Sequence, residues 1–250
     1  MVNKKVQRIK LIIAIVVVII VGIIVFLRID NYNKYGEKNM PYSISKIAII
    51  STARQLGNEN EKPIEETTSI WNFDVVQNND LYIEIKNDRD EKNKIKRVSI
   101  ENIEITEKPS KGNLKIFMPN STDGARYTYE DDFEVNTSLT YGGADESSFK
   151  DLKINKNGGI ISISFANKEL GAYSSGEDTE ITYDGRMLSK LGITSEDVKS
   201  KVAFDLVIEL EDGKTYAGRI DLDLNCEGLV ENGTTKQEIT DFSNVIFKRR

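Results

Sequence analysis

An uninterrupted apolar run near the amino terminus constrains this chain more than any other feature. Residues Leu11–Leu27 (LIIAIVVVIIVGIIVFL) include no charged or polar side chain, and Lys10 and Arg28 bracket them. A helix rises about 1.5 Å per residue, so the run has the length needed to cross the hydrocarbon core of a bilayer. The sequence therefore predicts one transmembrane helix over residues 11–29.

The charges beside the run predict its orientation. Residues 1–10 form a basic tail without any acid, whereas residues 30–41 contain both signs of charge. Excess Lys and Arg stay on the cytoplasmic side of a membrane, so we expect a cytoplasmic amino terminus. In this orientation, we expect residues 30–41 to form a short stalk and residues 42–250 to form an extracytoplasmic domain.

A cleaved signal peptide is the alternative explanation, because it also combines a basic region with an apolar core. The run is longer than a usual signal-peptide core of about 7–15 residues. The sequence Phe26–Asp30, where cleavage would fall, offers no small-x-small site. We therefore expect an uncleaved signal anchor and a single-pass protein of the cell membrane.

The composition limits the partners of the domain. The chain has a net charge of −6 although its first ten residues are basic, so the excess of acid lies beyond the apolar run. Nucleic acids and anionic lipid surfaces both attract surplus Lys and Arg, so we expect neither as a partner of the domain. The single cysteine, Cys226, excludes an internal disulfide, and packing must hold the domain together.

From Tyr42 onward, apolar residues alternate with polar ones, which is typical of strands with one buried face. Three of these apolar faces are Leu81-Ile83-Ile85, Leu114-Ile116-Met118 and Ile161-Ile163-Phe165. The polar residues Gln77–Asp80 are interpreted as a turn between two strands. A last apolar strand is predicted over 245–247.

Local signals predict a bulge, a hairpin and two short helices. The apolar alternation changes phase between Ile100 and Ile103, which predicts a β-bulge near Glu101-Asn102. Asp212-Gly213 separates two alternating runs and predicts a hairpin with a two-residue turn. Outside the transmembrane segment, helix is expected only over 187–191 and after an N-cap at Thr194.

Many short strands separated by turn residues indicate an all-β fold. We expect an antiparallel β-sandwich of immunoglobulin-like or jelly-roll type behind the single transmembrane helix. The turn-rich segment Pro119–Asp132 divides the domain into lobes 42–119 and 133–250. These lobes are either two domains or the halves of one sandwich.

The absence of histidine removes several kinds of active site. Without it, Ser-His-Asp and Cys-His nucleophiles and imidazole-bound zinc are excluded. The chain also lacks the glycine-rich loops that bind nucleotide phosphates. Among the common kinds of active site, those that use carboxylates are not excluded by this composition.

One loop combines carboxylates with aromatic residues. Its members are Tyr127, Tyr129, Glu130, Asp131 and Asp132. Sugar-cleaving sites use two carboxylates, and aromatic rings stack on sugars, so the loop is a candidate glycan-binding or glycan-hydrolysing site. A solvated acidic loop is the simpler explanation, because neighbouring carboxylates are poorly placed to flank a scissile bond.

A second group of oxygen-bearing side chains could hold calcium. Asp221, Asp223 and Asn225 alternate along one predicted strand and therefore share a face. Oxygen ligands suit calcium, so a calcium-stabilised adhesion module is a further hypothesis. Cys226 stands where an EF-hand loop needs glycine, which makes a solvent-facing strand the simpler explanation. No other cofactor is expected.

The layout of basic tail, apolar run and acidic β domain resembles uncharacterised membrane-anchored envelope proteins of low-GC Gram-positive bacteria. This resemblance rests on layout and composition, without a motif, and implies no site residues. We expect a non-catalytic binding or scaffold protein of a bacterial cell envelope. Its partner would be another protein or an envelope polymer, and the glycan-active and calcium-bound functions are the alternatives.

Overall fold

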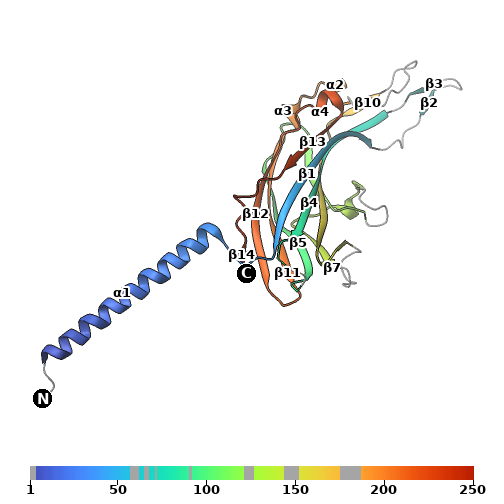
Figure 1. The fold of residues 1–250 in the computed structure, drawn as a ribbon. Coiled ribbons are helices and arrows are strands. Elements are labelled where there is room, and N and C mark those ends of the chain that lie inside the picture. The colour runs from blue at the N-terminus through green and yellow to red at the C-terminus, as the bar shows by residue number, and fades with distance from the viewer. Residues whose placement is uncertain are drawn as a thin grey trace.

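A long amino-terminal helix projects from a β-rich domain (Figure 1). The computed structural model describes residues 4–56, 62–64, 68–70, 72–89, 92–120, 127–143, 152–174 and 187–250. Helix α1 covers Lys4–Tyr35. Its stretch Lys10–Tyr35 is long enough and apolar enough to cross a membrane, and it is the one such helix among the described residues. An amino-terminal signal sequence has the same properties. No residue in the most apolar window of this stretch is buried, and Phe26 is 68% exposed.

The strands form two six-stranded sheets and one small pair. Sheet 1 has the spatial order β13 (Thr234–Ile239), β1 (Tyr42–Leu56), β4 (Asn72–Asn87), β9 (Gly158–Lys168) and β6 (Asn113–Phe117), and β10 (Ala172–Ser174) pairs with β4. Sheet 2 has the order β14 (Lys248–Arg249), β12 (Thr215–Leu224), β11 (Ser200–Leu210), β5 (Ile95–Glu107), β7 (Ser138–Gly143) and β8 (Lys153–Ile154). The pair consists of β2 (Lys62–Ile64) and β3 (Thr68–Ile70). Strands β7 and β8 run parallel, and the other pairings described here are antiparallel.

One hydrophobic cluster draws on both six-stranded sheets. Leu81 of β4, Phe165 of β9 and Phe204 of β11 are fully buried members of it. The expected alternation is confirmed here, because the apolar faces point into the cluster; each side chain of this size contributes about 1.5–3 kcal/mol when buried. Strands from residues 42–119 and from residues 133–250 occur in both sheets and share the cluster.

The predicted β-bulge is confirmed. Asp205 pairs with Glu101 but Ala203 pairs with Glu104, so β5 has one extra residue directly after Glu101. Asn102 has φ of 50°, a left-handed conformation that asparagine adopts more readily than most residues. The bulge restores the burial of Ile103 after the change of phase.

The predicted hairpin between β11 and β12 is also confirmed, but its loop is longer than expected. The Leu210 amide donates to the Lys214 carbonyl at 2.9 Å, which leaves the three residues Glu211–Gly213 in the loop. The Gly213 amide donates to the Leu210 carbonyl at 3.0 Å, and Gly213 has φ of 82°. This is a type I turn followed by one left-handed residue, a common three-residue hairpin loop.

Short helices occur at the end of the β-rich domain away from α1 (Figure 1). They are α2 (Met187–Lys190), α3 (Ser195–Val198) and α4 (Leu229–Asn232). Elsewhere in the domain, the 3₁₀ turn η2 covers Asp131–Phe133. The expected N-cap is confirmed, since the Thr194 amide donates to the Asp197 carboxylate at 2.9 Å. Hydrogen bonds from Thr194 hold the pKa of Asp197 well below its usual value.

The prediction of a turn at Gln77–Asp80 is wrong, because β4 runs without interruption through these residues. Their side chains are buried, and neighbouring strands supply hydrogen bonds. Ser51 Oγ donates to Asn79 Oδ1 at 2.5 Å, and Thr52 Oγ1 donates to Asn78 Oδ1 at 2.7 Å. Polar residues are tolerated within a sheet when such partners are present.

The carboxyl-terminal segment returns to the end of α1 (Figure 1). The Arg249 amide donates to Tyr32 Oη at 2.8 Å, and the Glu37 amide donates to the Phe247 carbonyl at 2.8 Å. The final strand, β14, begins at Lys248 and not at 245–247 as predicted. The last turn of α1 is therefore hydrogen-bonded to the domain.

Candidate functional site

A hollow of about 310 Å³ lies on the outer face of sheet 2, the face turned away from the shared core. Strands β5, β7, β11 and β12 contribute side chains from their outward positions, and the carboxyl-terminal residue completes the lining. The lining residues are Arg97, Ser99, Glu101, Thr140, Val207, Glu209, Thr215 and Arg250. We call this hollow the sheet 2 groove.

The central lining residues of the groove are small or uncharged. Ser99 and Val207 are each 6% exposed, although both point away from the hydrophobic cluster. The hydroxyls of Ser99 and Thr140 lie 3.0 Å apart and share a hydrogen bond. The groove therefore offers hydroxyl groups that can donate to or accept from a polar ligand.

One side of the groove is built around the Glu209 carboxylate. Lys96 Nζ lies 2.9 Å from Glu209 Oε1, and Arg97 Nε pairs with Glu209 Oε2. Burial alone would raise the pKa of Glu209, but the hydrogen bonds from Lys96 and Arg97 outweigh it and lower that pKa. A carboxylate with a lowered pKa accepts hydrogen bonds and is poorly suited to act as a general acid near neutral pH.

Arg250 places a cation in the groove from the end of the chain. Its backbone amide donates to the Thr215 carbonyl at 2.9 Å. Its Nη1 lies 2.7 Å from Glu101 Oε2, and its Nη2 lies 3.3 Å from Asp205 Oδ2. The groove thus presents a guanidinium, carboxylates and hydroxyls within one concave surface.

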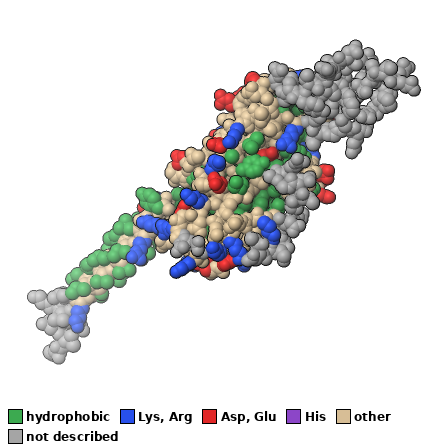
Figure 2. Space-filling view, turned by 45° about the vertical axis from the view of Figure 1, so that its right-hand side comes forward, with side chains coloured by type: hydrophobic (Ala, Val, Ile, Leu, Met, Phe, Trp, Pro, Cys, Tyr) green, Lys and Arg blue, Asp and Glu red, His purple; other side chains and the backbone are tan. Residues whose placement is uncertain are grey.

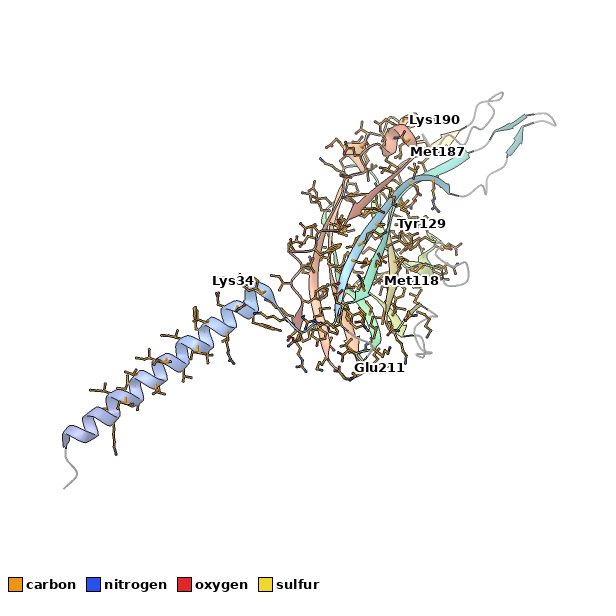
Figure 3. The ribbon with its side chains drawn as sticks, viewed as in Figure 1. Lys34, Met118, Tyr129, Met187, Lys190 and Glu211 are labelled. Carbon is orange, nitrogen blue, oxygen red and sulfur yellow. The ribbon has the colours of Figure 1, made fainter. Side chains whose placement is uncertain are left out.

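The aromatic and acidic loop predicted from the sequence lies on the outer face of sheet 1. Tyr127 and Tyr129 are buried, at 8% and 6% exposure, whereas Glu130, Asp131 and Asp132 are exposed. The rings are turned toward the sheet, so in this conformation they do not offer a stacking surface to a sugar. Figure 3 labels Tyr129 on this side of the domain.

The loop covers a carboxylate that sequence reasoning missed. Asp80 of β4 is 4% exposed; Ser164 Oγ donates to its Oδ1 at 2.6 Å and Asn78 Nδ2 donates at 2.9 Å. Arg54 Nη2 lies 3.9 Å from Asp80 Oδ2. Burial raises the pKa of Asp80 more than these partners lower it. The sequence carries no local signal for this burial, because Ser164 and the covering loop lie far from Asp80 along the chain.

The residues considered for calcium lie along β12 and just beyond it. Asp221, Asp223 and Asn225 are exposed and alternate with buried residues, as the pattern predicts. Lys201, on the neighbouring strand β11, lies 3.8 Å from Asp223. Within the part of the chain that is described, no three Asp, Glu, Cys or His side chains gather as a metal site would require.

Comparison with known proteins adds no functional assignment. No protein-family model, curated protein or solved structure matches the chain.

Proposed function

We propose that this chain is a single-pass membrane protein that displays a non-catalytic binding or scaffold domain outside the cytoplasm. The observation that carries the proposal is α1, whose exposed apolar surface ends where its last turn is hydrogen-bonded to the domain. Figure 2 shows apolar side chains along the visible face of this helix. A bilayer would cover them, because no described part of the domain does.

The contacts of α1 also support an uncleaved anchor. The helix continues from the apolar run to Tyr35 without a break, and its residue Tyr32 bonds to Arg249. Cleavage near Leu27 would separate this last part of the helix from the apolar run. The basic tail before Lys10 supports a cytoplasmic amino terminus, as the positive-inside rule predicts.

The order of the strands favours the immunoglobulin-like form of the proposed sandwich. Strands β1-β4-β9-β6 follow the order A-B-E-D, and β12-β11-β5-β7 follow the order G-F-C-C′ of an immunoglobulin variable domain. One connection differs, because β6, the equivalent of strand D, precedes β7, the equivalent of strand C′. We propose one such sandwich that includes both lobes.

The sheet 2 groove is the proposed binding site, and an envelope polymer rich in hydroxyl and amide groups is the proposed ligand. Its hydroxyls and paired charges match the donors and acceptors of such a polymer. The lowered pKa of Glu209 makes this carboxylate unsuited to the general-acid step of hydrolysis near neutral pH. The exposed carboxylates of the Tyr127–Asp132 loop, in contrast, adjoin buried rings.

A labelling experiment tests the topology. A cysteine that replaces exposed Lys190 on α2 should react with a membrane-impermeant maleimide on intact cells, whereas one that replaces Lys5 should react only after permeabilisation. The labelled product should keep the full mass of 28.2 kDa. A shortened product released from the membrane, or labelling of position 5 on intact cells, would refute the anchor or its orientation.

A thermal-shift experiment tests the binding site. Peptidoglycan fragments and oligosaccharides should raise the unfolding midpoint of the full chain in detergent, because a ligand that binds only the folded state stabilises it. Thr140→Trp should abolish the shift by filling the groove, and Ser138→Trp, exposed on the same face of β7 but outside the lining, should keep it. A shift with calcium alone would support the adhesion module instead, and no shift with any polymer would contradict the proposed ligand.

A further inference from the structure

Five exposed basic side chains gather where α1 meets the domain. They are Arg28, Lys34, Lys38, Lys248 and Arg249, which we call the juxtamembrane cluster. Figure 2 shows basic side chains at this junction, and Figure 3 labels Lys34 at the end of α1. Residues far apart in sequence meet here because the carboxyl-terminal segment is hydrogen-bonded to Tyr32 of α1 and to Glu37 just beyond it.

Most of the cluster has no acidic partner. Asp30 pairs with Lys34 at 2.9 Å, but no ion pair of Arg28, Lys248 or Arg249 occurs among the described residues. The nearby acid Asp212 is paired with Lys214, and Arg249 interacts with it only through space, without an ion-pair contact among the described residues. Asp30 and Glu37 offset two of the five cations, so the local charge is still positive, although the chain as a whole carries a net charge of −6.

The cluster lies at the height of a lipid headgroup. Arg28 directly follows the apolar run, and Lys34 lies six residues farther along α1, which is about 9 Å at 1.5 Å per residue. Arg249 is held beside Tyr32, between these two levels. All three positions fall within roughly one Debye length, about 8–10 Å, of the membrane surface.

The carboxyl-terminal residues differ in what their charges contact: Arg250 pairs with acids, whereas Lys248 and Arg249 do not form ion pairs among the described residues. Its guanidinium is occupied by Glu101 and Asp205 in the sheet 2 groove. Lys248 and Arg249, which pair with β12 through the backbone, leave their charges exposed at the junction. The ion pairs of Arg250 thus hold two exposed cations, Lys248 and Arg249, beside α1.

We propose that the juxtamembrane cluster binds the headgroups of anionic phospholipids and thereby fixes the domain against the membrane from which it projects. The proposal rests on the membrane anchor proposed above. The acid excess of the whole chain argued against an anionic lipid partner, but the fold concentrates cations at the one place where headgroups lie. Each cation near an anionic surface contributes about a fivefold gain in affinity.

The test uses the full chain in nanodiscs of phosphatidylcholine, with or without one third phosphatidylglycerol, and native mass spectrometry to count retained lipids. The wild-type chain should retain phosphatidylglycerol selectively at low salt. Lys248→Gln with Arg249→Gln should weaken that retention about 25-fold. The matched control, Lys190→Gln with Lys199→Gln, removes two basic charges at the far end of the domain and should leave it unchanged.

Two results would overturn the inference: equal retention of both lipids by the wild-type chain, or equal selectivity in the wild type and the Lys248/Arg249 double variant. Flotation with phosphatidylcholine vesicles after a carbonate wash separates this failure from that of the anchor. A chain that floats but shows no lipid preference contradicts only the cluster. A chain that does not float contradicts the anchor itself.

Discussion

Replacing Asp80 by asparagine should make the stability of the domain less dependent on pH. Asp80 is 4% exposed beneath the Tyr127–Asp132 loop, and burial raises its pKa above the ordinary value of 3.8 in spite of the bonds from Ser164 and Asn78. Its folded-state pKa is thus higher than its unfolded-state pKa. The stabilising contribution of the carboxyl is fully present below the unfolded pKa and is lost as the pH rises through the folded pKa.

The size of the effect follows from linkage. One proton is involved, so the free energy of unfolding changes by at most about 1.4 kcal/mol per pH unit in this window. Asparagine keeps an oxygen acceptor for Ser164 and carries no charge. We therefore expect Asp80→Asn to match the wild type in acid. At neutral pH the free energy of unfolding of the variant should exceed that of the wild type. The difference should be about 1.4 kcal/mol for each unit by which the folded-state pKa of Asp80 exceeds its unfolded-state pKa.

Urea unfolding of the full chain in detergent, repeated across the acid and neutral range, measures this difference. Glu209→Gln is the matched control, and its effect on the pH dependence of stability should have the opposite sign. The reason is that Lys96 and Arg97 lower the pKa of Glu209 below 4.5. The wild type should be more stable than that variant above the unfolded pKa and lose its advantage as the pH falls through the folded pKa. A difference between wild type and Asp80→Asn that stays constant with pH would refute the argument.

Two further substitutions test the packing. Phe204→Ala should lower the free energy of unfolding by about 3–5 kcal/mol in urea titrations, because Phe204 is fully buried between the sheets; a loss below about 1 kcal/mol would contradict the shared core. Gly218→Ala would place a Cβ 3.0 Å from the Phe247 ring and 3.1 Å from Val245. It should displace the carboxyl-terminal segment and speed hydrogen exchange at the Arg249 amide. Unchanged exchange would contradict this, because it would mean that the Phe247 and Val245 side chains adjust while the segment stays in place.

Local features of the fold could be predicted from the sequence because local physics determines them. Alternation identified the buried faces of β4, β9 and β11, and its change of phase located the bulge at Glu101-Asn102. The error at Gln77–Asp80 has a physical cause. A polar run resembles a turn unless its partners are known, and those partners, such as Ser51 and Ser164, lie on other strands.

The groove and the buried carboxylate could not be predicted, because they depend on which strands become neighbours. Ser99 and Thr140 are ordinary outward positions until β5 pairs with β7. The sequence gives no sign that Arg250 will reach Glu101. The tyrosine and acid loop was found by composition, but whether its rings face solvent or the sheet depends on long-range packing.

In the proposed topology, the position of β1 has a consequence for export. This strand follows α1 directly, yet it lies between β4 and β13, so that Ile47 faces Ile239. With the amino terminus held in the cytoplasm, β1 would be the first strand to leave the translocation channel. Its neighbour β13 would be among the last. At about 5–20 residues per second, roughly 10–40 s would separate the two. During that interval one edge of β1 stays open to pairing with other chains, and shielding it would be the work of a chaperone on the far side of the membrane.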